Sequence, residues 1–117
     1  MTVTEALEKL KSYEQTSFAL SHAMGLLYYD GVTAAPKGAA DVRSDTTGEL
    51  SRIDYQLTTA ADTVEMLETL MAARTELDDV TRRKVEEYWR SYDRTRRIPQ
   101  EEFVAYQKLT TRADDVW

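Results

Sequence analysis

Residues that reverse the chain direction are scarce in this sequence, which contains four glycines and two prolines. Glycine and proline are the residues that most often mark turns, so few turns are available to divide the chain. Apolar residues recur at the three- and four-residue spacing of helices, and no window alternates as a strand would. We therefore predict an all-α fold of about five helices in an up-and-down, bundle-like array, forming a single domain over residues 1–117.

The first predicted helix begins with a capping box at Thr2 and Glu5 and ends near Gly31. One side of this helix carries a stripe that is apolar except for one serine: Leu7, Leu10, Tyr13, Ser17, Leu20, Met24 and Leu27. Phe18, Leu26 and Tyr28 widen the stripe in the second half of the helix. We expect that half to be buried on more than one side.

The other predicted helices follow a loop at residues 31–39, which contains Pro36 and Gly38. The second helix is expected from about Ala40 to Thr58, with an apolar face made of Val42, Leu50, Ile53 and Leu57. Two more helices are expected at residues 63–74 and from Leu77 onward, and Pro99 opens the last. Their apolar stripes are Val64, Met66, Leu67, Leu70 and Met71; Val85, Tyr88, Trp89 and Tyr92; and Phe103, Tyr106, Leu109, Ala113 and Trp117.

The residue types that carry most catalytic chemistry are missing or single. There is no cysteine, which excludes disulfides and thiolate sites and fits a cytoplasmic location. The one histidine, His22, cannot supply the two imidazoles of a His-Glu-x-x-His zinc site, and we interpret it as a structural residue. No glycine-rich phosphate loop is present. We predict no catalytic and no metal-binding residue in this chain, so that it is not an enzyme by itself.

The charge distribution bears on possible partners. The net charge is −6, yet residues 82–97 hold seven bases and three acids. Aromatic residues between these bases suggest a nucleic-acid surface, but aromatic residues at helical spacing are more typical of a core. We therefore expect no nucleic-acid partner. The most apolar stretch, residues 18–29, is too short to span a bilayer, and we expect no membrane role.

Three segments resemble the thermostable carboxypeptidase (Taq) family of zinc metallocarboxypeptidases. Residues 20–45, LSHAMGLLYYDGVTAAPKGAADVRSD, are similar to a family pattern of a helix ending in Leu-Leu-x-Trp-Asp, a Pro-x-Gly-Ala loop and a helix with an early arginine. Residues 86–103, EEYWRSYDRTRRIPQEEF, are similar to the family's Tyr-Asp-Arg followed by a basic residue, an aliphatic residue and proline. Residues 109–117, LTTRADDVW, resemble a helix that continues into the catalytic part. Order and spacing agree over nearly the whole chain.

The resemblance implies an all-helical enzyme that removes single residues from peptide C-termini. In the family, zinc is held by the two histidines of His-Glu-x-x-His and a downstream glutamate, at the floor of a deep groove. None of these residues occurs here, so we expect zinc only in a full-length parent from which this segment is truncated. By this resemblance the segment is an N-terminal wall or lid of the groove, and the residues expected to face substrate are Tyr29, Asp30, Arg43, Arg94 and Arg96.

The partners that the resemblance implies are the remainder of the same polypeptide, a peptide substrate and a second copy, since family members are commonly homodimers. Two alternatives remain open. A stand-alone helical module for protein interaction or self-association would expose an apolar patch around Phe103 and Trp117. A nucleic-acid binder would use the basic helix and lose affinity steeply with added salt.

Overall fold

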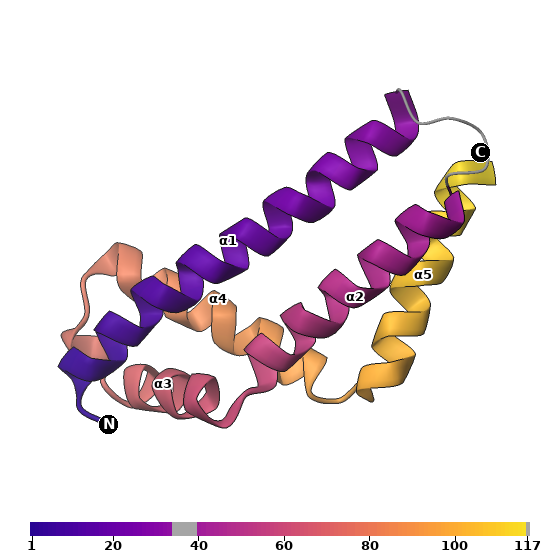
Figure 1. Ribbon diagram of the computed structural model, residues 1–117. Coiled ribbons are helices and arrows are strands. Elements are labelled where there is room, and N and C mark those ends of the chain that lie inside the picture. The colour runs from indigo at the N-terminus through magenta and orange to yellow at the C-terminus, as the bar shows by residue number, and fades with distance from the viewer. Residues whose placement is uncertain (34–39, 117) are drawn as a thin grey trace. The chain divides into compact units, whose positions relative to one another are not determined.

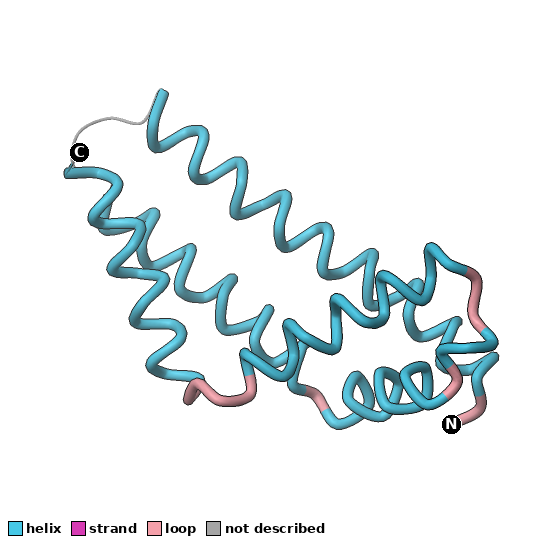
Figure 2. The backbone as a smooth tube through the Cα atoms, turned by 180° about the vertical axis from the view of Figure 1, so that it is seen from behind, coloured by secondary structure: helices cyan, strands magenta, loops and turns pink. Residues whose placement is uncertain are grey.

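The computed structural model describes residues 1–33 and 40–116, and within these ranges it contains five α-helices, one short 3₁₀ helix and no strand (Figures 1 and 2). This confirms the predicted all-α class. The elements are α1 (Val3–Thr33), α2 (Ala40–Thr59), α3 (Ala61–Ala72), η1 (Arg74–Glu76), α4 (Asp79–Thr95) and α5 (Gln100–Val116). None of the described helices has the length and hydropathy needed to cross a membrane.

The chain divides into two compact units. Unit 1 consists of Met1–Thr16 and Gln56–Ile98, so it contains the first half of α1 together with α3, η1 and α4. Unit 2 consists of Ser17–Tyr55 and Pro99–Trp117, and it contains the second half of α1, most of α2, and α5.

Local signals at the helix starts are borne out. The backbone N–H of Glu5 donates to the hydroxyl oxygen of Thr2 at 3.1 Å, as the capping box predicts. Asp78 is the N-cap of α4, and its carboxylate accepts from the backbone N–H of Thr81 at 2.8 Å. That hydrogen bond, together with one from the Thr81 hydroxyl, lowers the pKa of the Asp78 carboxyl.

The end of the first helix differs from the prediction. Gly31 does not stop α1, which continues to Thr33. Glycine is a poor helix former but not an absolute barrier, and tertiary contacts override its propensity. The rest of the predicted loop, residues 34–39 with Pro36 and Gly38, lies outside the described residues, as does Trp117.

The core of unit 1 is an apolar cluster contributed by three helices. Its fully or nearly fully buried members are Ala6, Leu10 and Tyr13 of α1, Met66, Leu67 and Leu70 of α3, and Val85 of α4. The ring of Tyr13 meets the ring of Tyr88 edge-on, with centroids 5.4 Å apart. The stripes predicted for the first half of α1, for α3 and for α4 all face this cluster, so those predictions are confirmed.

Unit 2 is organised around α2, which contacts both other helices of the unit. On one side the Ser51 hydroxyl lies 3.9 Å from the sulfur of Met24 in α1. On the other side three ion pairs join α2 to α5: Asp41–Arg112 at 3.2 Å, Asp45–Lys108 at 3.8 Å, and Arg52–Glu101. Successive pairs advance by four and then seven residues on α2 and retreat by the same steps on α5, which defines an antiparallel register.

The predicted face of α2 is buried only in part. Leu57 packs against the unit 1 cluster and Leu50 is half-buried, but Val42 and Ile53 are 70% and 49% exposed. Small residues of the same helix are buried instead: Ser44, Gly48 and Ser51. Small side chains let helix backbones approach closely, and here the hydroxyl of Ser44 donates to the backbone carbonyl of Lys108 in α5 at 3.1 Å. Close approach of α5 to the small residues of α2, rather than the burial of large apolar side chains, therefore determines which side of α2 faces α5.

Apolar residues on the other two helices of unit 2 are also exposed. In α5, Tyr106 and Leu109 are each 65% exposed, while Val104 is buried, so the predicted α5 stripe is wrong at these positions. Phe103 of the same stripe is half-buried, with its ring centroid 5.5 Å from that of Tyr55. In α1, the residues expected to bury a second side of the helix are exposed as well: Phe18, Leu26 and Tyr28. Within the described residues, unit 2 supplies neighbours for only one side of that part of α1.

The unit 1 cluster yields a stability prediction. Leu70 is fully buried, so Leu70→Ala should lower the free energy of unfolding by about 2–5 kcal/mol, through lost transfer energy and the cavity left behind. Val80→Ala at an exposed position of α4 should change it by less than about 0.5 kcal/mol. Urea denaturation followed by circular dichroism measures both, and equal effects of the two substitutions would contradict the assigned core.

Candidate functional site

The five residues expected to face substrate fall in both units. Tyr29 and Asp30 lie near the end of α1 and are exposed, and they belong with Arg43 to unit 2. Arg94 and Arg96 lie at the end of α4 in unit 1, and both are exposed.

Arg43 is placed differently from the other four, because it is only 7% exposed. Its side chain lies over Gly31 of α1, where an added Cβ would come within 2.6 Å of the guanidinium Nε. Glycine at this position therefore gives the arginine the room that it occupies. Arg43 is packed between α1 and α2, where it serves the structure of unit 2.

The two arginines of α4 are not equivalent. Arg96 pairs with Asp93 at 2.7 Å, and its guanidinium lies 5.9 Å from the centroid of the Tyr92 ring. The hydrogen bond from Arg96 is the main cause that lowers the pKa of the Asp93 carboxyl. Arg94 has no such ion pair with the residues that the structure describes. Arg94 is thus the more available of the two for an external anion.

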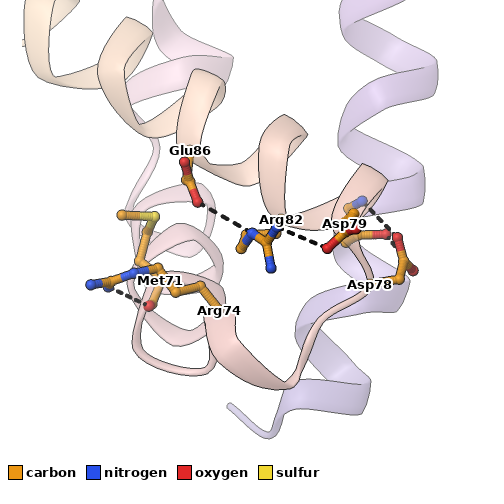
Figure 3. A network of polar contacts seen from close by, with 7 residues as sticks. Met71, Arg74, Asp78, Asp79, Arg82 and Glu86 are labelled. Atoms are coloured by element: carbon orange, nitrogen blue, oxygen red, sulfur yellow. Dashed lines mark hydrogen bonds and ion pairs between the residues drawn. The ribbon is translucent and has the colours of Figure 1, made fainter.

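Most of the basic charge of α4 is taken up by neighbouring acids. Figure 3 shows Arg82 between Asp79 and Glu86, at 2.8 Å and 3.8 Å. Of the seven bases in residues 82–97, five pair with described carboxylates: Arg82, Lys84, Arg90, Arg96 and Arg97. Four of these bases pair at three- or four-residue spacing and Lys84 pairs with Glu14 of α1, so little of the positive charge is left without a neighbouring acid.

Sequence reasoning missed an open cleft in unit 1, of about 310 Å³. It is lined by Met71, Arg74, Glu86, Trp89 and Arg90. The turn at η1 brings the end of α3 against α4 there, and the Arg74 guanidinium donates to the Met71 carbonyl at 3.0 Å (Figure 3). The spacing of Glu86, Trp89 and Arg90 on one side of α4 was the available signal, but the facing residues depend on the turn.

A half-buried polar cluster links α1 and α4 within unit 1. The Tyr88 hydroxyl donates to the Glu14 carboxylate at 2.8 Å, and Lys84 lies 3.4 Å from the same oxygen. Burial, and then the hydrogen bond to Glu14, raise the pKa of Tyr88 to about 12. At neutral pH the phenol is therefore a fixed donor that joins the two helices, not a proton-transfer group.

The described residues were expected to contain no zinc ligands, and their side chains form no group suited to zinc. Among residues 1–33 and 40–116, no three side chains of the metal-binding types His, Cys, Asp and Glu gather closely enough to hold an ion. Structural or catalytic zinc needs at least three protein ligands. The described residues do not fit a zinc site.

Comparison with known proteins identifies the class. Residues 9–117 match the model of the carboxypeptidase Taq (M32) metallopeptidase family, and the chain belongs to that family. It is 27% identical over 116 residues to Carboxypeptidase 1 of Bacillus subtilis (strain 168). The alignment covers 93% of this chain but 23% of that protein, so the chain spans about a quarter of its relative's length. No solved structure matches it.

Two glycines of α1 allow a matched test of the Arg43 packing. Gly31→Ala should destabilise the chain, because the new methyl group must displace a buried guanidinium. Gly25→Ala should stabilise it by about 1 kcal/mol, since its Cβ would meet nothing within 4 Å and alanine is the better helix former. Thermal unfolding of the two variants measures both effects, and a stabilising Gly31→Ala would refute the assigned packing.

The raised pKa of Tyr88 predicts a dependence of stability on alkaline pH. The stabilisation from the neutral phenol is fully present below the pKa of an unfolded tyrosine, near 10, and is lost as the pH rises through about 12. Tyr88→Phe should therefore make the unfolding free energy fall less steeply between these two values. Denaturant titrations at several pH values measure the slope. Identical slopes for both proteins would mean that Tyr88 titrates normally.

Proposed function

We propose that this chain is the N-terminal helical segment of a zinc-dependent metallocarboxypeptidase that releases C-terminal residues from peptides. The observation that carries the proposal is the family match over residues 9–117, joined to a carboxypeptidase relative about four times as long. In such a protein the segment shapes or covers the substrate groove and does not catalyse the reaction alone. Zinc and its ligands belong, in this proposal, to the remainder of the parent protein.

The arginines indicate how the segment would contact substrate. A peptide C-terminus is a carboxylate, and arginine recognises carboxylates through paired, charge-assisted hydrogen bonds. Arg43 is buried and Arg96 already pairs with Asp93, so Arg94 is the candidate that the geometry favours for this contact. Asp30 is exposed and remains a candidate for contacts with the peptide chain, whereas Tyr29 shares the apolar side of α1 that carries Phe18 and Leu26.

Two further features belong to the proposal. A cytoplasmic location is supported by the absence of cysteine. Assembly as a homo-oligomer is supported by the apolar side chains that unit 2 exposes, because exposed apolar patches mark interaction surfaces.

The proposal is tested in a chimera. Replacing the matched segment of Bacillus subtilis Carboxypeptidase 1 with this chain should give a zinc-dependent enzyme that releases C-terminal residues. Arg94→Ala in the chimera should raise KM for a peptide about tenfold, which corresponds to ~1.4 kcal/mol of lost binding. Arg83→Ala is the matched control, since Arg83 is also an exposed arginine of α4.

The outcomes separate the parts of the proposal. A folded, zinc-loaded chimera without peptidase activity would refute the role in a carboxypeptidase. Equal effects of Arg94→Ala and Arg83→Ala on KM would show that Arg94 does not contact the substrate. Release of residues by the 117-residue chain alone would contradict its non-catalytic role.

A further inference from the structure

On one side of α1 the exposed residues change from polar to apolar along the helix. Phe18, His22, Gly25, Leu26 and Tyr29 follow one another at spacings that place them on the same side, and we call them the outer face of α1. All five are exposed, with Phe18 at 71%, Leu26 at 60% and Tyr29 at 66%. The Phe18 and His22 rings meet edge-on, with centroids 6.0 Å apart.

Before Phe18 the exposed residues on the same side of the helix are polar. By helical spacing, Glu8, Lys11 and Gln15 precede the outer face, and all three are exposed. Leu7, also on this side, is half-buried against the unit 1 cluster. A helix side that faces only water is expected to be polar throughout. The change to phenylalanine, leucine and tyrosine therefore marks a surface that is covered from about Phe18 onward.

The opposite side of the same helix segment is already occupied. Leu20, Met24 and Leu27 are half-buried, and the Met24 sulfur lies 3.9 Å from the Ser51 hydroxyl of α2. The outer face thus cannot be explained as the side that packs within unit 2. An additional apolar surface is needed to cover these side chains.

Gly25 indicates that the covering surface approaches α1 closely. A Cβ at Gly25 would meet nothing within 4 Å, so no contact in the described structure requires glycine there. Glycine inside a helix lowers its stability, and its usual benefit is a close approach by another backbone or ligand. Gly25 lies among Leu26, Tyr29 and His22, where an incoming chain would pack most tightly.

We propose that the outer face of α1 is the surface on which this segment docks against the remainder of its own, longer polypeptide. The proposal rests on the proposed function, since the chain corresponds to 23% of a carboxypeptidase relative and the other three quarters are available to cover the face. The contact is apolar, is centred on Gly25, and includes one imidazole, that of His22, that needs a hydrogen-bonding partner.

The test compares the same substitutions in two settings, the 117-residue chain and the chimera with Bacillus subtilis Carboxypeptidase 1. Gly25→Ala should raise the melting temperature of the chain alone and lower that of the chimera, because the methyl group helps the helix but blocks the close approach. The pair Phe18→Ser with Leu26→Ser should leave the melting temperature of the chain alone nearly unchanged and lower that of the chimera. Val80→Ser, equally exposed in unit 1, is the matched control and should have the same effect in both.

Hydrogen exchange gives a second readout that does not depend on melting. Amides of residues 18–30 should exchange at least about tenfold more slowly in the chimera than in the chain alone. Equal exchange, equal effects of Gly25→Ala in both settings, or a chimera that does not fold with the intact face would overturn the proposal. A folded chimera with protected α1 amides but no peptidase activity would keep the docking and refute the proposed function.

A second copy of the chain is the competing occupant. Sedimentation velocity of the chain alone should give the same particle for the original sequence and for Phe18→Ser with Leu26→Ser. A dimer that these substitutions dissolve, and that Val80→Ser leaves intact, would assign the outer face to self-association and overturn the proposal.

Discussion

The burial of α3 against its neighbours is the interaction on which unit 1 depends. Met66, Leu67 and Leu70 are fully buried from a helix of 12 residues, and each such side chain contributes about 1.5–3 kcal/mol when removed from water. The ion pairs around the cluster, such as Lys9 with Asp62 at 2.6 Å, lie at an exposed edge where charge pairs contribute little. Unit 1 therefore has the energetics of an ordinary small globular core, and the polar contacts mainly fix how its helices align.

Unit 2 does not have an apolar core of the kind found in unit 1. Its buried side chains are largely small or polar, and its α2–α5 contact is aligned by exposed ion pairs, which fix register without adding much stability. The large apolar side chains of the unit, among them Phe18, Val42 and Leu109, face outward. Covering these side chains with further apolar surface would add to the stability of the unit.

The extent to which the sequence predicts the structure follows the same division. In unit 1 the apolar stripes of the helices also form the core, so periodicity identified Leu10, Leu67 and Val85 correctly. In unit 2 the rule that the apolar side faces the interior of the same chain holds only in part, and it failed for Val42 and Ile53 of α2 and for Tyr106 and Leu109 of α5. The capping box at Thr2 was accessible because it depends on a few adjacent residues, whereas the end of α1 was not. The burial of Arg43 was not, because it depends on Gly31 of another helix, which periodicity treats only as a helix breaker.

Three groups with shifted pKa values, Tyr88, Asp78 and Asp93, fix contacts within and between helices. A catalytic acid or base needs a pKa near the working pH and access to a substrate. Tyr88 is held neutral by burial and by Glu14, and Asp78 and Asp93 are held charged by a helix cap and an arginine. These three shifts hold each group in one protonation state near pH 7, so the contacts fix helix ends and helix pairs, whereas burial alone raises the pKa of the Asp54 carboxyl. Among the arginines expected to face substrate, Arg94 is exposed and has no carboxylate paired with it among the described residues, so it is the one of that set most open to an incoming anion.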